Sequence, residues 1–169
     1  MKSSSTSGVR RSACIALVAL AAVGLAPRTA SADATAFLGF STSPSTRAAR
    51  GFAVGFSLVV VGFEFEYGSS SEDPPSRAPS LRTGSFNGLV QTPFEIARMQ
   101  IYGTLGAGVF REVLDTNSET NLAVNFGGGV KMRIYGPIRL RIDYRAFRLN
   151  GSALYPHPQR LYAGLNLKF

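Results

Sequence analysis

The residues Ile138-Arg139-Leu140-Arg141-Ile142-Asp143-Tyr144 decide the fold of this chain. Every second side chain is apolar, and the side chains between them are charged. Successive side chains of a β-strand point to opposite faces of the sheet, so this alternation predicts a strand and not a helix. The stretch is therefore expected to be a strand with one apolar face and one ionic face.

The same alternation recurs through most of the chain, and no stretch sustains a helical period. Between Gly51 and Tyr67 the apolar positions change from even to odd numbers after Leu58, which marks a turn between two strands. The expected eight strands lie near residues 34–41, 51–58, 59–67, 81–92, 99–109, 122–134, 138–144 and 161–169.

The connecting segments fall into two classes that alternate along the chain. Short connections are expected near residue 58, at 93–98 and at 135–137. Long segments rich in Ser, Pro, Asp, Glu and Asn are expected at 42–49, 68–80, 111–121 and 150–159. This order predicts an up-and-down sheet with the long loops at one end and the short turns at the other.

The first 32 residues read as a secretory signal peptide. Three basic residues precede an apolar stretch at 13–26, and Ala30-Ser31-Ala32 follows it. We expect cleavage after Ala32, with Ala34 as the alternative, and a mature domain at 33–169. No uncharged apolar run reaches the roughly 18 residues that a spanning helix needs, so a helical membrane protein is not expected.

The leader also accounts for much of the positive charge. The whole chain carries a net charge of +8, which by itself would suggest nucleic acid as a partner. Removing the four basic residues of the leader leaves 14 against ten acidic residues, a net charge of +4. We therefore expect no nucleic-acid partner. The single cysteine, Cys14, would leave with the leader, so the mature chain would have no disulfide and no thiolate.

The apolar faces are expected to meet lipid. The opposite faces are rich in glycine, which relieves crowding inside a narrow closed barrel. Strands of about ten residues, with short turns at one end, suit a tilted crossing of a bilayer. We therefore predict an all-β fold, an eight-stranded antiparallel up-and-down transmembrane β-barrel. A soluble barrel with these faces inside, such as a periplasmic carrier, is the alternative. The expected members of two aromatic girdles are Tyr67, Phe110 and Phe147 at the loop end, and Phe94, Tyr135 and Phe169 at the turn end.

The chain ends with Tyr162-Ala163-Gly164-Leu165-Asn166-Leu167-Lys168-Phe169. This ending resembles the assembly signal of bacterial outer-membrane β-barrels, in which Gly164, Leu167 and Phe169 would be the signal residues. With the leader and the alternating strands, the mature chain resembles the small outer-membrane barrels of the outer membrane protein A and X type. The resemblance implies a location in the outer membrane of a Gram-negative bacterium and insertion by the barrel assembly machinery.

If the apolar faces meet lipid, a set of charged side chains must project into the lumen. The turn at Gly136 places Arg133 opposite Arg139 and Lys131 opposite Arg141, so carboxylates must intervene. The third and seventh strands lie on opposite sides of such a barrel, so we expect carboxylates of the third to meet arginines of the seventh. The predicted lumen charge network is Glu64, Glu66, Lys131, Arg133, Arg139, Arg141, Asp143 and Arg145. It would fill the lumen, although a narrow, porin-like ion path is an alternative.

Arginines also gather in and beside the long loops. Their forked guanidinium groups suit phosphate, which lipopolysaccharide would present at that height. The alternative is a solvated basic rim. The candidate lipopolysaccharide contacts are Arg47, Arg50, Arg77, Arg82, Arg111, Arg148 and Arg160.

Catalysis has little support in the sequence. Some small barrels of the outer membrane modify lipid A, and the resemblance would then require a histidine working with a serine. The chain has one histidine, His157, with Ser152 nearby in sequence. No clustered metal-binding pattern and no phosphate-binding loop is found, so we expect no cofactor. The sequence thus predicts a monomeric outer-membrane protein with a structural or surface-interaction role, and a lipid A-modifying enzyme is the lesser alternative.

Overall fold

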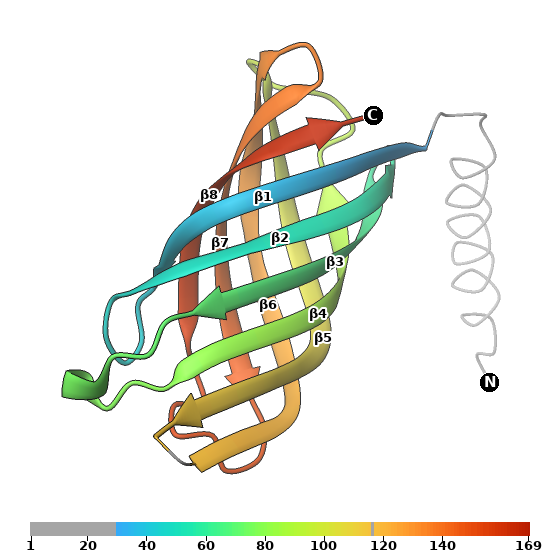
Figure 1. The fold of residues 1–169 in the computed structure, drawn as a ribbon. Coiled ribbons are helices and arrows are strands. Elements are labelled where there is room, and N and C mark those ends of the chain that lie inside the picture. Colours follow the sequence, from blue (N-terminus) through green and yellow to red (C-terminus); the bar gives the residue numbers. More distant parts are fainter. Residues whose placement is uncertain (1–29, 116) are drawn as a thin grey trace, which may run out of the picture.

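The computed structural model describes residues 30–115 and 117–169, which form a closed barrel of eight antiparallel strands. Each strand pairs with its neighbours in sequence, and β1 closes the barrel against β8, whose end lies beside the beginning of β1 (Figure 1). The strands are β1 (Ser31–Ser41), β2 (Arg47–Leu58), β3 (Val61–Ser70), β4 (Ser80–Gln91), β5 (Met99–Leu114), β6 (Asn117–Tyr135), β7 (Ile138–Leu149) and β8 (Gln159–Lys168).

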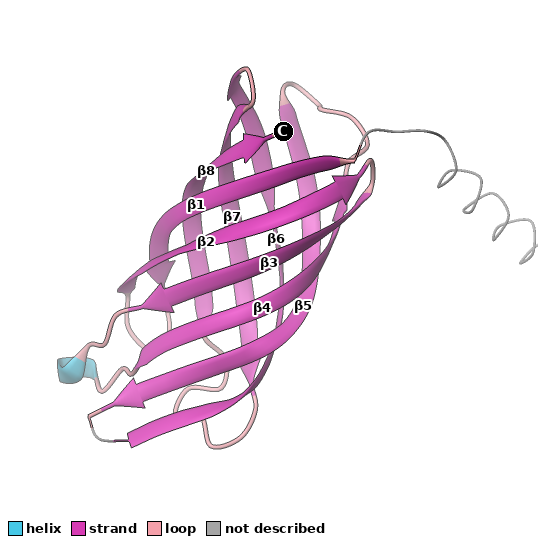
Figure 2. Cartoon of the chain, turned by 45° about the vertical axis from the view of Figure 1, so that its right-hand side comes forward, coloured by secondary structure: helices cyan, strands magenta, loops and turns pink. Residues whose placement is uncertain are grey.

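The strand count and the up-and-down order agree with the sequence prediction. Short turns gather at one end of the barrel, and the longer loops lie at the other (Figure 2). One loop carries a short 3-10 helix, η1 (Pro74–Ser76). No helix in the described part of the chain is long and apolar enough to cross a membrane. Of the predicted leader, residues 1–29 lie outside the described residues, and β1 already begins at Ser31.

One predicted loop is wrong. Most of the segment 111–121 continues the hairpin of β5 and β6, because Arg111 pairs with Thr120 and Val113 pairs with Ser118. The side chains of this extension are mostly polar, so the alternation that marks the lipid-facing part of a strand fades there. A strand that continues beyond an apolar environment has no need of an apolar face, and its sequence then resembles that of a loop.

The barrel has the reverse polarity of a soluble protein. Large apolar side chains cover its outer surface, with Leu38 71%, Leu105 64% and Phe86 59% exposed. Charged side chains fill the inside, where Arg141 and Arg145 are fully buried. Water would penalise such an outer surface, whereas hydrocarbon would not, and hydrocarbon also requires the closed hydrogen bonding that this sheet provides. The barrel is therefore a transmembrane barrel.

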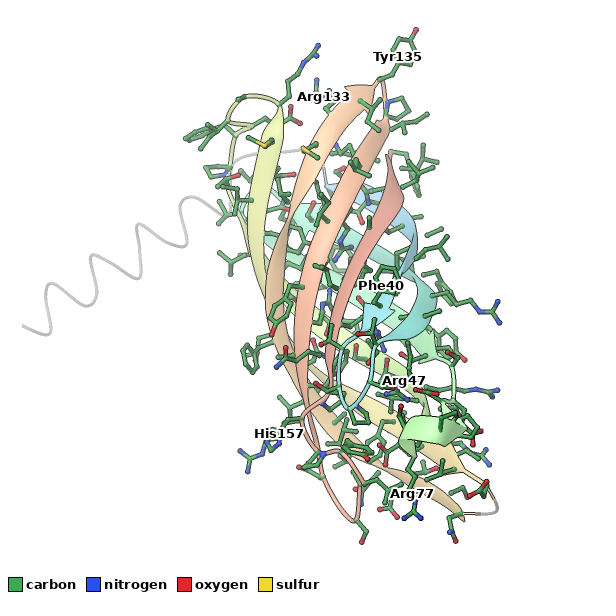
Figure 3. All side chains as sticks on the ribbon, turned by 90° about the vertical axis from the view of Figure 1, so that its left-hand side faces the viewer. Phe40, Arg47, Arg77, Arg133, Tyr135 and His157 are labelled. Atoms are coloured by element: carbon green, nitrogen blue, oxygen red, sulfur yellow. The ribbon has the colours of Figure 1, made fainter. Side chains whose placement is uncertain are left out.

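The predicted aromatic girdles need a correction. Phe110 and Phe147 point into the lumen and are buried, because they share the inward-facing parity of their strands. They pack with Leu81, Ala123 and Leu149 in an apolar layer inside the loop end. Of the remaining predicted members, Tyr67 is partly exposed, and Phe94, Tyr135 and Phe169 are exposed. Figure 3 shows Tyr135 at the turn end of the barrel.

The change Phe86→Arg tests whether the outer face of the barrel contacts lipid. This side chain faces outward four residues from Arg82, toward the middle of the apolar surface. An arginine near the bilayer midplane costs about 2–4 kcal/mol, so the free energy of unfolding from lipid vesicles should fall by that amount. The matched change Ser118→Arg, at an exposed position opposite Val113 in the polar extension of β6, should have little effect. Equal stability of both variants would contradict the assignment of the outer face to lipid.

Candidate functional site

Two groups of charged residues stand out, one inside the barrel and one on its outer surface. The inner group begins with β3 and β7, which contribute carboxylates and arginines from opposite sides of the lumen. The register around Gly136 pairs Arg133 with Arg139 and Lys131 with Arg141, as the position of the turn predicted. The strand register therefore makes neighbours of basic side chains in both pairs.

Carboxylates of β3, on the opposite side of the lumen, bind Arg141 and Arg145 of β7. Arg141 Nη2 donates to Glu64 Oε1 at 3.1 Å, and Arg145 Nη2 donates to the same oxygen at 3.0 Å. Arg145 Nη1 also lies 3.0 Å from Glu66 Oε2. Asp143, between the two arginines on β7, accepts from Arg141 Nη2 at 2.8 Å and from Arg145 Nε at 3.2 Å.

Arg160, which was predicted to be a lipopolysaccharide contact, completes this group. Its register partner on β7 is Arg145, and Glu66 binds both, with Arg160 Nη1 at 3.3 Å from Glu66 Oε1. The central network thus consists of three arginines and three carboxylates, all fully or almost fully buried, and has no net charge. Balance of this kind is what a buried ionic cluster requires.

Two tyrosines outside the predicted set of lumen residues support the network. Tyr162 donates its hydroxyl proton to Glu66 Oε2 at 3.0 Å, and its ring stacks on Phe37 with centroids 4.0 Å apart. Tyr102 donates to Asp143 and accepts from Arg141 Nε at 2.7 Å. Each residue shares the inward parity of its strand, which is the signal that could have found it.

Smaller ion pairs lie toward the turn end. Lys131 Nζ is 2.7 Å from Asp33 Oδ2, and both residues are buried. Glu95 binds Arg139 at 3.0 Å and Arg133 at 2.8 Å. The side chain of Arg133 is 49% exposed, so this residue lies at the mouth of the barrel, whereas the other predicted network residues lie inside it. Asp33 is the first residue after the expected cleavage at Ala32, and cleavage after Ala34 would remove this partner of Lys131.

Arg47 and Arg160 are not on the outer surface, and their prediction as lipopolysaccharide contacts is wrong. Both are buried because each occupies an inward position of its strand. Arg47 donates to the backbone carbonyls of Ser43 at 3.0 Å, Ser71 at 3.3 Å and Pro79, and so ties the β1–β2 loop to the β3–β4 loop.

A second contact joins these two loops. Ser45 Oγ donates to Asp73 Oδ2 at 2.8 Å. Hydrogen bonds from Ser76 and Ser45 lower the pKa of Asp73 below its ordinary value. The β1–β2 and β3–β4 loops are therefore held together by polar contacts and not left as independent segments.

The other five candidate arginines are exposed, and three of them form a row across the outer surface. Arg50 on β2 pairs with Ser69 on β3, Ser69 pairs with Arg82 on β4, and Arg82 pairs with Arg111 on β5. In the described chain no carboxylate lies within 4.0 Å of these guanidinium groups. We call Arg50, Arg82 and Arg111 the arginine row. The remaining two are Arg77 and Arg148.

The arginine row lies on the loop side of the apolar surface. On β2 the outward positions after Arg50 are Phe52, Val54, Phe56 and Leu58. The eight residue steps from Arg50 to Leu58 cover about 20 Å along the barrel axis, for a rise of about 3.3 Å per residue and a tilt of about 40°. This span is close to the height of the apolar band of an outer-membrane barrel, so the row is at the level of lipid headgroups.

The residues considered for catalysis are not brought together. His157 and Ser152 are both exposed in the loop between β7 and β8, and in the described chain no hydrogen bond joins their side chains (Figure 3 labels His157). The described residues also contain no group of three or more His, Cys, Asp or Glu side chains that could hold a metal ion.

The predicted assembly signal lies at the closure of the barrel. Across this closure Leu167 pairs with Ala34 and Gly164 pairs with Phe37. Leu167 and Phe169 face outward and are exposed. Gly164 faces inward against Phe37, and a Cβ there would lie 2.8 Å from the Phe37 Cβ, which is too close for any side chain. Glycine at this position therefore has a packing role independent of any recognition.

Of the comparisons with known proteins, the one with solved structures supports the fold. No protein-family model and no curated protein matches the chain. The structure is similar to Neisserial surface protein A, with a TM-score of 0.63, 17% identity, and coverage of 83% of this chain and 96% of that one. It is also similar to the N-terminal β-barrel domain of Pseudomonas aeruginosa OprF, with a TM-score of 0.61, 14% identity, and coverage of 82% and 97%.

A third similar structure is that of the outer membrane enzyme PagL, with a TM-score of 0.51, 11% identity, and coverage of 80% of this chain and 98% of that one. The chain thus has the fold of the small eight-stranded β-barrels of the outer membrane. Because this fold occurs both in a surface protein and in an enzyme, function has to be argued from the charged groups of this chain.

Glu64→Gln tests the central network. The change keeps the shape of the side chain but leaves Arg141 and Arg145 with one counter-charge fewer in a buried site. Breaking a buried pair in this way costs about 3–5 kcal/mol, and denaturant unfolding followed by circular dichroism should show a loss of that size. The exposed loop change Glu72→Gln is the control. A free energy of unfolding that is equal in both variants would show that the network is dispensable.

Proposed function

We propose that this chain is a monomeric integral protein of a bacterial outer membrane with a structural or surface-interaction role, inserted by the barrel assembly machinery. The reversed polarity of the barrel is the observation that carries this proposal, because only a hydrocarbon environment suits such an outer surface. The fold comparisons support the choice of membrane. Outer-membrane fractionation with heat-dependent gel mobility is the direct test, and a soluble product would refute it.

The proposal includes a lumen that does not conduct ions. An eight-stranded barrel is just wide enough for side chains to fill it, and here Arg141, Asp143, Arg145 and Glu66 are fully buried at its centre. The apolar layer around Phe110 and Phe147 fills the loop end of the lumen on the side of β4 to β7. An ion would have to displace the paired charges of the central network to pass through. A narrow ion channel is the alternative.

Recording in planar bilayers separates the two. The purified protein should give no reproducible single-channel openings, and Glu64→Ala should give none either, because neighbouring arginines and tyrosines still occupy the lumen. The loop variant Glu72→Ala serves as the control for handling and insertion. A steady conductance that changes with Glu64→Ala would mean that the lumen is an ion path.

The proposal also includes contact with lipopolysaccharide at the arginine row. Three exposed guanidinium groups, which have no carboxylate partner among the described residues, lie at headgroup level on the loop side. Arg82 and Arg111 are direct register partners, and like charges at such positions repel unless an anion lies between them. Phosphate groups of the outer leaflet supply that anion, and the guanidinium fork suits their geometry.

The triple change Arg50→Gln, Arg82→Gln and Arg111→Gln should weaken lipopolysaccharide binding by about tenfold or more. Exposed ion pairs contribute up to about 1 kcal/mol each, so three together reach this factor. Binding to the unchanged protein should weaken as salt rises, and binding to the variant should respond less. Arg133→Gln, at the other mouth of the barrel, is the control. Affinity that ignores both salt and the triple change would refute the contact.

A further inference from the structure

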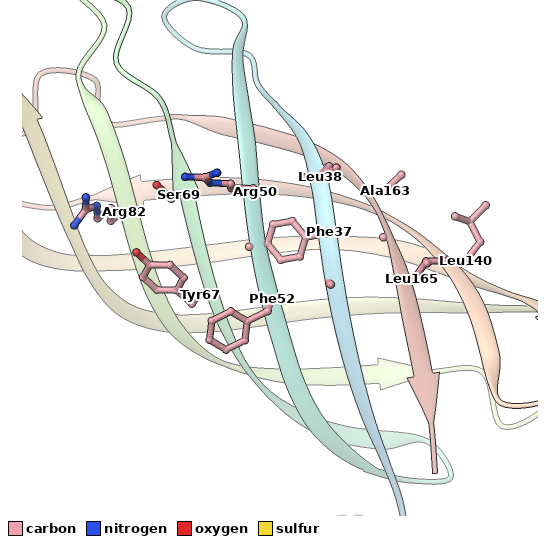
Figure 4. Close-up of a pocket in the computed structure, with 13 residues that line it drawn as sticks. Phe37, Leu38, Arg50, Phe52, Tyr67, Ser69, Arg82, Leu140, Ala163 and Leu165 are labelled. Carbon is pink, nitrogen blue, oxygen red and sulfur yellow. The ribbon is translucent and has the colours of Figure 1, made fainter.

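An open groove crosses the outer surface of the barrel beside the arginine row, from β7 and β8 over β1 to β4 (Figure 4). Its shape follows from the sizes of neighbouring side chains. Across the closure of the barrel, Ala36 pairs with Leu165, and Leu38 pairs with Ala163. The alanines leave space that the leucines and Phe52 border.

The groove has one charged edge. Arg50 and Arg82 line it on the loop side, with Ser69 between them and the ring of Tyr67 below, as Figure 4 shows. Every other part of its lining is apolar side chain or glycine backbone. The groove therefore combines an apolar body with a cationic edge, which is the arrangement that an anionic lipid requires.

The charged edge continues beyond the groove to Arg111, and the spacing within the row is uneven. Arg82 and Arg111 are on adjacent strands, about 5 Å apart, whereas Arg50 is two strands from Arg82, about 10 Å away. One phosphate can lie between the adjacent pair. A second phosphate is then needed to meet Arg50, and the hydroxyl of Ser69 can donate to it. A lipid with a single phosphate would leave one end of the row without an anion.

We propose that this surface holds one lipid A molecule with two phosphates. One phosphate lies between Arg82 and Arg111, the other lies at Arg50 and Ser69, and one acyl chain runs in the groove over Ala36 and Ala163. The inference rests on the proposed lipopolysaccharide contact and deepens it, because it names the strands, the number of phosphates and the place of an acyl chain. The depth of the row agrees with it, since the groove extends from headgroup level into the apolar band.

The experiment uses the purified barrel in phosphatidylcholine nanodiscs, and native mass spectrometry measures how much bisphosphorylated lipid A remains bound. In the groove variant, Ala36→Phe with Ala163→Phe, both new side chains remain apolar and face lipid, but they fill the groove. This variant should bind at least tenfold less lipid A. Ala107→Phe makes the same change at an outward position of β5 outside the groove and should bind as the unchanged protein does.

The lipid is varied in the same assay. Monophosphorylated lipid A should bind the unchanged protein at least tenfold more weakly than the bisphosphorylated form. This difference should disappear when Arg82→Gln and Arg111→Gln remove the adjacent pair. Equal binding of both forms to the unchanged protein, or equally tight binding of phosphatidylglycerol, would overturn the assignment to a lipid with two phosphates.

The two proposals can fail separately. If the groove variant binds like the unchanged protein while the triple arginine variant loses binding, the groove inference is wrong and the lipopolysaccharide contact stands. If neither variant loses binding, both are wrong. Should the groove variant not fold, lipid A with a photoreactive acyl chain replaces it. Crosslinks of this lipid to the unchanged protein at Ala36 or at 163–165 support the groove, and crosslinks confined to other strands overturn it.

Discussion

The structure depends on the fact that hydrocarbon offers no hydrogen-bond partner to a peptide group. A sheet in that environment must pair every strand on both sides, and here β1 and β8 complete the circle through nine register pairs from Asp33–Lys168 to Ser41–Arg160. In a closed barrel, each side chain points either into the lumen or outward into lipid. The outward side chains are apolar because lipid surrounds them. The inward side chains fill a narrow lumen, and any charge among them must be neutralised by a partner there.

The inner face shows how that filling is achieved with charged residues. The register makes Arg145 and Arg160 neighbours of like charge, and Glu66 from another strand binds both of them. Glycines on β5 and β6 make room for the long side chains. At Gly129, for example, an added Cβ would lie 2.6 Å from the hydroxyl of Tyr102. A buried ionic cluster gives little net stability compared with an apolar core, but it specifies which strands lie across from one another.

Much of the fold could be predicted from the sequence, because an alternation of apolar and polar residues indicates both where a strand lies and which of its side chains point inward. The pattern predicted the eight strands, and the turn at Gly136 predicted the register of the lumen arginines. The same parity, continued past the apolar positions, would also have placed Arg47, Arg160, Phe110 and Phe147 inside. Tertiary partners such as Asp33 with Lys131 carry no such signal, because they come from strands far apart in the chain. The groove was equally hidden, since its alanines meet only when β1 pairs with β8.

The apolar layer around Leu81, Phe110 and Phe147 makes the two ends of the lumen chemically different. It occupies the loop end of the lumen on the side of β4 to β7, while at the other end Arg133 and Glu95 are open to water. The two ends of the lumen therefore differ, because water reaches the ion pairs at the turn end, whereas apolar side chains occupy part of the loop end. A rise in salt concentration is thus expected to weaken the exposed pair of Arg133 with Glu95 before it affects the buried central network.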